Sequence, residues 1–177
     1  MHYKLINIPN LKEVSTDLYR AVPWVNRRQT VFNVLPKEYF EELTSVRNVV
    51  ELIKPWSEVA GVCVITTMPD DDMPIHVDGN GTKKDGFGFN IPVYNCEDCY
   101  TVVYDVKGSA TPSDPFSTPT FGHPYQIFEP EEVVEVDRLY YKDCGFLINT
   151  DKPHKVVNPT DKPRIVASFR FLTKVEL

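Results

Sequence analysis

The chain has 177 residues and a formal net charge of −6 at pH 7, with 42% hydrophobic and 25% charged residues. This length supports one domain with a substantial core and leaves little room for a second. The acidic balance argues against a nucleic-acid partner, because such proteins usually present a basic face. No apolar run reaches the ~20 residues that span a bilayer, and no basic leader precedes an apolar stretch, so we expect a cytoplasmic protein without a membrane partner.

The first predicted element is a helix in the N-terminal third. After Pro36, apolar residues recur at three-to-four spacing from Tyr39 to Ile53, which is the pattern of an amphipathic helix. Pro36 fits the first turn of this helix and Pro55 fits its end. We therefore expect residues 1–58 to form a helical N-terminal part.

From about residue 59 the pattern changes to short strands. Segments rich in β-branched and aromatic residues are separated by turn residues: VAGVCVITT, GFGFNIPVYN, CYTVVYDV, YQIFEPEEVVEVDRLYY, CGFLIN and PRIVASFRF. Such a series predicts an antiparallel sandwich or barrel over about residues 59–172. Residues 111–124 are dense in Pro, Ser and Thr and predict a long loop, which is a lid, a binding loop or simply mobile. No linker divides the chain, so we expect residues 1–177 to form one domain.

The cysteines leave three alternatives open: a metal site, a disulfide or reduced thiols. Cys96 and Cys99 form one CxxC pair, whereas Cys63 and Cys144 stand alone. A structural zinc site normally needs two such pairs, or one pair with a spaced histidine partner. Without a secretory leader a disulfide is disfavoured, and we expect reduced cysteines in strands and turns.

The strongest candidate for chemistry is the motif His76-Val-Asp78. Alternate residues of a strand face the same side, so this histidine and aspartate project together as two metal ligands if the segment is extended. His154, in the same β-rich half, is the best third ligand, because the other histidines lie at the terminus and in the Pro-rich segment. Alone, an HxD triplet is also typical of an exposed strand. Two histidines and a carboxylate on one face leave three positions open, as non-haem Fe(II) oxygenases require.

A second pattern links His154 to Arg164. The tetrapeptide TDKP precedes each of them, and the turn-forming residues 158–161 lie between. We predict a hairpin that brings the two side chains onto neighbouring strands, where the arginine can hold a carboxylate beside the metal. Ser168, four residues further along the same strand face, is a candidate to add a hydrogen bond.

The HVD motif, His154 and Arg164 together resemble the signature of the Fe(II)/2-oxoglutarate-dependent oxygenase superfamily. The resemblance covers about residues 60–172. It implies a mainly β fold with N-terminal helices, the double-stranded β-helix (jelly roll, cupin-like), with the helices packed on one sheet. It also implies that His76, Asp78 and His154 bind iron, and that Arg164 anchors the distal carboxylate of 2-oxoglutarate.

Some positions around this signature differ from common family patterns. Many members place Ser or Thr two residues after the arginine, where this chain has Val166, and the nearest hydroxyl is that of Ser168. Asn90, in the strand after the HVD motif, is a further candidate to contact the cosubstrate. The ending RIVASFR also resembles the final strand of the nucleic-acid demethylating branch, with Arg170 as a second arginine, but Val166 stands where that branch usually has asparagine.

The resemblance implies an enzyme that uses Fe(II), 2-oxoglutarate and O2, and that releases succinate and CO2. Asp78 among the ligands favours hydroxylation over halogenation, for which a small residue there would leave room for a halide. We expect a small-molecule or peptidyl substrate, contacted by the segments 79–86 and 111–124. Two alternatives stay open: a non-catalytic jelly-roll binding module, and a cupin-like metalloprotein that does not use 2-oxoglutarate. The sequence does not indicate an oligomeric state.

Overall fold

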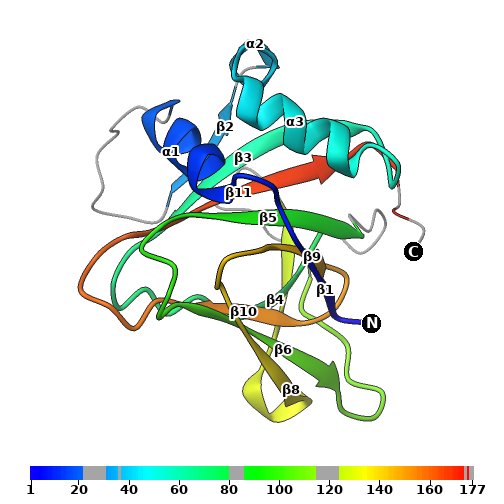
Figure 1. The fold of residues 1–177 in the computed structure, drawn as a ribbon. Helices are drawn as coiled ribbons and strands as arrows, with labels where there is room; N and C mark the ends of the chain where they lie inside the picture. The colour runs from blue at the N-terminus through cyan, green and yellow to red at the C-terminus, as the bar shows by residue number, and fades with distance from the viewer. Residues whose placement is uncertain (22–30, 36, 80–85, 115–123, 174, 176–177) are drawn as a thin grey trace.

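The computed structural model describes the chain at residues 1–21, 31–35, 37–79, 86–114, 124–173 and 175. Within these ranges two antiparallel sheets lie face to face, and the helices cover the outer face of the larger sheet (Figure 1). This is the mainly β, jelly-roll fold that the sequence predicts. No helix in the described ranges is long and apolar enough to cross a membrane.

Each sheet combines strands that are distant in sequence. The larger sheet has the spatial order β1 (Tyr3–Ile6), β9 (Gly145–Asn149), β5 (Phe87–Tyr94), β11 (Arg164–Phe171), β3 (Val59–Thr67) and β2 (Val31–Leu35). The smaller sheet has the order β7 (Tyr125–Phe128), β4 (Ile75–Asp78), β10 (His154–Val157), β6 (Tyr100–Val106) and β8 (Val133–Tyr140), and the short 3-10 helix η1 (Pro130–Glu132) precedes β8. Most strands therefore pair with non-consecutive neighbours, and the chain crosses repeatedly between the sheets.

The first 58 residues are not only helical, which corrects the expectation from sequence. They contain the helices α1 (Leu11–Ala21), α2 (Lys37–Glu42) and α3 (Thr44–Ile53), but β1 and β2 from the same stretch form the two edges of the larger sheet. These strands have only four and five residues. So short a segment contains too few alternating positions to be recognised by periodicity.

The sequence predicts a single helix over residues 36–53. This prediction is wrong, because the helix is interrupted at Leu43. This residue is extended, with φ −79° and ψ 108°, and its carbonyl accepts a hydrogen bond from the Arg47 backbone N–H at 2.9 Å. Its side chain packs against the hydrophobic core. A one-residue interruption leaves the spacing of the apolar residues nearly intact, so periodicity does not reveal it. Pro36, the expected first-turn residue, lies outside the described residues.

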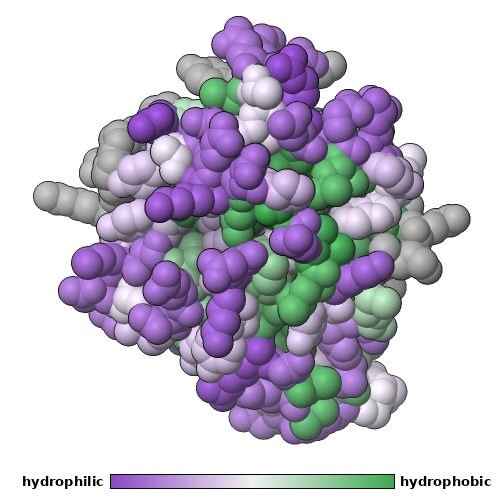
Figure 2. Space-filling model, in the orientation of Figure 1, coloured by the Kyte–Doolittle hydropathy of each residue, from purple (hydrophilic) through white to green (hydrophobic). Residues whose placement is uncertain are grey.

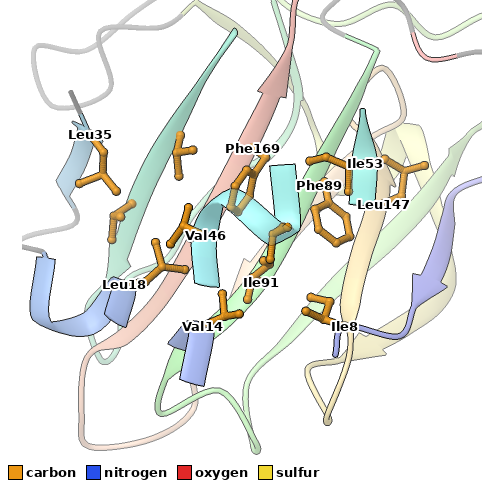
Figure 3. Packing of buried hydrophobic residues seen from close by; sticks show 14 of the residues in the cluster. Ile8, Val14, Leu18, Leu35, Val46, Ile53, Phe89, Ile91, Leu147 and Phe169 are labelled. Atoms are coloured by element: carbon orange, nitrogen blue, oxygen red, sulfur yellow. The ribbon is translucent and has the colours of Figure 1, made fainter. Parts of the chain in front are cut away.

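A hydrophobic core fills the space between the helices and the larger sheet (Figure 3). The helices contribute residues three or four positions apart, and the strands contribute alternate residues. The buried members from α1, α3, β5 and β11 are Val14, Leu18, Val46, Val49, Ile53, Phe89, Ile91, Ile165, Ala167 and Phe169. Burial of each large side chain contributes about 1.5–3 kcal/mol. The same alternation turns Asn90 and Ser168 to the other face of the larger sheet, toward the smaller sheet.

The edge strand β8 combines exposed apolar and charged residues. Hydrophilic side chains cover much of the face in Figure 2, while hydrophobic side chains are visible across its middle and in a small group at the bottom, over β8. Val134 and Val136 on this strand are 50% and 49% exposed. Glu135, Asp137 and Arg138 are exposed among them. Charges on an edge strand oppose pairing with another chain, so β8 is a protected edge.

The sequence predicts a hairpin between His154 and Arg164, and this prediction is wrong. Strand β10 pairs with β4 and β6, whereas β11 pairs with β3 and β5, so the intervening turn carries the chain from one sheet to the other. Asn158 makes the side-chain hydrogen bonds of a turn: its Oδ1 accepts from the Thr160 N–H at 3.2 Å. Its Nδ2 also donates to the Thr67 carbonyl at 3.0 Å, which ties the turn to β3. Turn chemistry alone does not decide which sheet the next strand joins.

Candidate metal centre and carboxylate pocket

Three potential ligands converge from two paired strands of the smaller sheet. His76 and Asp78 lie two residues apart on β4, and His154, the first residue of β10, is directly opposite His76 in the antiparallel register. One ligand atom from each residue lies within 4.8 Å of the other two. The imidazole centroids are 4.4 Å apart, and His76 Nε2 is 3.7 Å from Asp78 Oδ1. The structure brings together the three residues that the sequence indicates as a ligand set.

Backbone carbonyls orient both imidazoles in the same way. His76 Nδ1 lies 2.9 Å from the Pro74 carbonyl oxygen, and His154 Nδ1 lies 2.9 Å from the Lys152 carbonyl oxygen. Because a carbonyl oxygen only accepts, each Nδ1 carries the proton and donates it. The Nε2 lone pair of each ring is therefore available to bind a metal. Burial, with a further contribution from the neighbouring His76, lowers the pKa of His154 to about 4, so this ring is neutral at physiological pH.

The two oxygens of Asp78 have different partners. Oδ2 accepts a hydrogen bond from Arg170 Nη1 at 2.8 Å, while Oδ1 lies nearer His76. Burial opposes ionisation of Asp78, but the charge and the hydrogen bond of Arg170, together with the electrostatic effect of the two imidazoles, outweigh it and hold the pKa of this carboxyl below its usual range. Gly88 lies opposite Arg170 in the β5–β11 register, where an added Cβ would be 3.4 Å from Nη1, an ordinary contact distance. The carboxylate is therefore ionised and oriented, with one oxygen left for a metal.

Arg164 lies in the larger sheet, at the start of β11. This residue is 2% exposed, and its Nε has no hydrogen-bond partner. Its guanidinium carbon is 4.3 Å from the ring centroid of Tyr141. A cation over an aromatic face gains about 0.5–2 kcal/mol. No carboxylate of the described residues forms an ion pair with Arg164, so the ring is its main electrostatic partner.

One cavity between the two sheets connects Arg164 to the ligand cluster, which consists of His76, Asp78 and His154. The residues predicted for the site all line it: His76, Asp78 and His154 from the smaller sheet, and Asn90, Arg164 and Ser168 from the larger. Val166 and Arg170 line it as well, because alternate residues of β11 share one face. The other lining residues are Ile65, Thr67, Met73, Thr101, Tyr125, Tyr141, Ile148, Thr150 and Val156.

The positions of Ser168 and Asn90 place both near the Arg170 end of the cavity. The strand advances about 3.3 Å per residue, so Ser168 is about 13 Å along β11 from Arg164. Its hydroxyl instead lies beside Gly88, where a Cβ would be 3.5 Å away. Asn90 is the register partner of Ser168, and its buried Oδ1 has no hydrogen-bond partner. Asn90 and Ser168 are therefore better placed to contact a molecule bound near Arg170 and the cluster of metal-binding residues.

The residues surrounding Arg164 were not found by sequence reasoning. Tyr141 directly follows β8, and its hydroxyl lies 2.8 Å from that of Thr101 on β6. Thr67 is the register partner of Arg164 on β3. A threonine within a strand, or a tyrosine just after one, is the only local signal that these positions carry. Their proximity to Arg164 depends on which strands pair and in what register, and sequence periodicity does not determine either.

The CxxC pair lies in a turn next to the larger sheet. Cys96 Sγ donates to the Ile165 carbonyl at 3.1 Å, and Cys99 Sγ donates to Asn158 Oδ1 at 3.2 Å. Both cysteines are free and buried. Burial raises the pKa of both thiols, and that of Cys99 to about 11. The two thiols hydrogen-bond the backbone and the turn that surround the start of β11.

Comparison with known proteins supports the fold but identifies no family. No protein-family model and no curated protein sequence matches this chain. The solved structure of the non-heme alpha ketoglutarate dependent carbocyclase SnoK from nogalamycin biosynthesis is similar, with a TM-score of 0.52 and 11% identity over 95% of this chain and 78% of that chain. The epimerase SnoN from nogalamycin biosynthesis has a TM-score of 0.49 and 16% identity over 95% and 75% of the two chains. At these identities, the likeness to SnoK establishes the fold alone.

Proposed function

We propose that this protein is an Fe(II)- and 2-oxoglutarate-dependent oxygenase. The observation that supports this most strongly is the state of Arg164, a guanidinium that is 2% exposed and faces a cavity also lined by the His-Asp-His cluster. A buried charge without a counter-ion is strongly disfavoured. The position therefore suits an anionic ligand that enters the cavity, and the distal carboxylate of 2-oxoglutarate is such an anion.

The chemistry of the three donors suits Fe(II). Two imidazoles that offer Nε2 lone pairs and one carboxylate oxygen form the facial set that leaves three coordination positions open in non-haem iron oxygenases. His76, His154 and Asp78 would hold the metal. When bound, Fe(II) would supply the activation of O2 for oxidation of a substrate C–H bond, coupled to conversion of 2-oxoglutarate to succinate and CO2.

The chain itself would contribute binding, orientation and charge. Arg164 would hold the distal carboxylate through two parallel N–H donors, which fixes the direction in which the keto acid enters the cavity. Arg170 orients Asp78 by holding Oδ2 at 2.8 Å. The Pro74 and Lys152 carbonyls keep both imidazoles in the tautomer that a metal requires.

We propose hydroxylation of a small-molecule or peptidyl substrate as the reaction. The net charge of −6 disfavours nucleic acid as the substrate. SnoK, which shares this fold, is named a carbocyclase, so the fold alone does not fix the outcome of the oxidation. Most of the segments 79–86 and 111–124, which we expect to contact the substrate, lie outside the described residues.

Anaerobic titration of the metal-free protein tests this proposal. Addition of Fe(II) followed by 2-oxoglutarate should produce a visible absorption band that requires both, and admission of O2 should then yield succinate. Arg164→Met should retain Fe(II) binding and lose the band at moderate 2-oxoglutarate concentration, whereas His154→Ala should lose both. Fe(II) binding without any effect of 2-oxoglutarate would instead support a cupin-like metalloprotein. Absence of metal binding would support a non-catalytic module.

A further inference from the structure

We infer that Tyr141 and Thr101 complete the binding site for the distal carboxylate: the tyrosine ring positions Arg164, and the paired hydroxyls donate one O–H to the ligand. This inference rests on the proposed function of the cavity. It assigns a task to two residues that lie outside the ligand cluster and outside the arginine motif. Both are almost fully buried, with 2% exposure for Tyr141 and 1% for Thr101, and both line the cavity.

The first step of the argument concerns the ring of Tyr141, which is fixed between two neighbours. One is the Arg164 guanidinium, whose central carbon is 4.3 Å from the ring centroid. The other is Phe146, whose ring meets that of Tyr141 edge-on at a centroid distance of 4.7 Å. Val166 belongs to the same buried cluster. Tyr141 therefore cannot move without disturbing the core, and it sets the position of the guanidinium.

The second step concerns what an aromatic partner leaves available. A carboxylate from the chain would neutralise Arg164 and occupy the donors of its planar fork. An aromatic face attracts the cation without accepting its N–H groups in the plane of the guanidinium. The Nε of Arg164 has no hydrogen-bond partner, in agreement with this. Tyr141 thus holds a buried arginine in a state in which it can still bind an external carboxylate.

The third step is a count of hydroxyl protons. Tyr141 Oη and Thr101 Oγ1 are 2.8 Å apart, and this is the one hydrogen bond that either hydroxyl makes within the described part of the chain. Two hydroxyls carry two protons, and their mutual bond uses one of them. The second O–H has no acceptor there, and leaving a buried donor unsatisfied is unfavourable. A carboxylate held by Arg164 would accept it.

The fourth step concerns the position two residues after Arg164, which is the next position on the same face of β11. This chain has Val166, which packs in an apolar cluster with Tyr141 and Phe146. Ser168 lies about 13 Å along the strand from Arg164, beyond the reach of its short side chain. The Thr101–Tyr141 pair therefore supplies from the opposite sheet the hydroxyl that β11 itself lacks.

The test compares 2-oxoglutarate with 2-oxovalerate, which carries a methyl group in place of the distal carboxylate. Their dissociation constants are measured by anaerobic titration of the Fe(II)-loaded wild type and variants. The double variant Thr101→Val with Tyr141→Phe keeps the ring and removes both hydroxyls. We expect it to bind 2-oxoglutarate at least about tenfold more weakly, the usual effect of losing a hydrogen bond to a charged group. Its affinities for Fe(II) and 2-oxovalerate should equal those of the wild type.

Single and control variants sharpen the test. Each single variant leaves one hydroxyl able to donate, so each should lose less affinity than the double variant. Tyr141→Leu removes the ring and should weaken 2-oxoglutarate binding even more than the double variant. Tyr104→Phe removes a hydroxyl on the other face of β6, where Tyr104 packs against the buried cluster that includes Ile75 and Val77, and should leave both affinities unchanged.

Three outcomes would overturn the inference, and they are distinguishable. If the wild type binds no 2-oxoglutarate, the proposed function fails and the inference fails with it. If the wild type binds 2-oxoglutarate and the double variant binds it equally well, the inference alone is wrong. If Thr67→Val causes the loss and the double variant does not, the hydroxyl comes from Thr67, the register partner of Arg164.

Discussion

Replacement of Arg164 by methionine should stabilise the protein when no 2-oxoglutarate is present. The arginine is 2% exposed, and its Nε is unsatisfied. A buried donor without a partner costs about 1–3 kcal/mol, while loss of the contact with the Tyr141 ring removes about 0.5–2 kcal/mol. Methionine is flexible and apolar, and it can fill much of the same space. The difference favours the variant by about 1 kcal/mol, which for a chain of 177 residues raises Tm by about 2–4 °C.

The same substitution should strongly weaken 2-oxoglutarate binding. Removal of one partner of a buried, hydrogen-bonded charge pair costs about 2–5 kcal/mol, so we expect the affinity to fall at least about 30-fold. At a ligand concentration of about 100 times the wild-type Kd, binding stabilises the wild type by about 2.7 kcal/mol and the variant by less than about 1 kcal/mol. The order of the two melting temperatures should therefore reverse when 2-oxoglutarate is added.

Thermal unfolding of both proteins with Mn(II), which replaces Fe(II) to prevent turnover, measures this reversal with and without 2-oxoglutarate. Arg138→Met is the matched control, because Arg138 also lies over a tyrosine ring, that of Tyr100 at 5.3 Å, but its side chain is 47% exposed and pairs with Glu135. The control should keep the full stabilisation by 2-oxoglutarate. A variant at position 164 that melts below the wild type without ligand, and that 2-oxoglutarate stabilises equally, would refute the reasoning.

Two further predictions concern the metal ligand and the core. Arg170→Met should weaken metal binding about 10- to 100-fold in a chelator competition assay, because Asp78 loses the hydrogen bond that orients it; tighter binding would show that repulsion between guanidinium and metal dominates. Gly145→Ala would place a Cβ 2.6 Å from Phe89 Cζ and should lower the free energy of unfolding in urea by about 1–3 kcal/mol. Gly61→Ala, with nothing within 4 Å of its Cβ, is the control, and an equal loss in both variants would contradict the packing argument.

The ligand cluster could be predicted because its geometry is mostly local. His76 and Asp78 share a face for a reason internal to one strand, the two-residue period of an extended chain. His154 could be predicted as the third ligand because it lies in the same β-rich half and few other histidines are available. The orienting carbonyls of Pro74 and Lys152 are also local, each two residues before its histidine, although nothing in the sequence pattern marks them.

The surroundings of Arg164 could not be predicted, because they depend on contacts between distant strands. Thr101 and Tyr141 are 40 residues apart, and each is far from Arg164 in the chain. A shift of one residue in any of these strand pairs would turn the side chain to the other face. The interruption of the helix at Leu43 could not be predicted for a different reason. Packing against the core favours an extended residue there, and helical periodicity does not include that effect.

The error about the hairpin shows what the fold contributes to the site. Had His154 and Arg164 been on adjacent strands of one sheet, these strands would lie about 4.8 Å apart and both side chains would project from the same wall of the cavity. The crossover at Asn158 instead sends the second strand into the other sheet, so the two side chains face one cavity from opposite walls. The Asn158 Nδ2 bond to the Thr67 carbonyl fixes this crossover at the residue that pairs with Arg164. This side-chain hydrogen bond therefore holds the turn beside Arg164, whose level in the cavity is set by the pairing of β11 with β3 and β5.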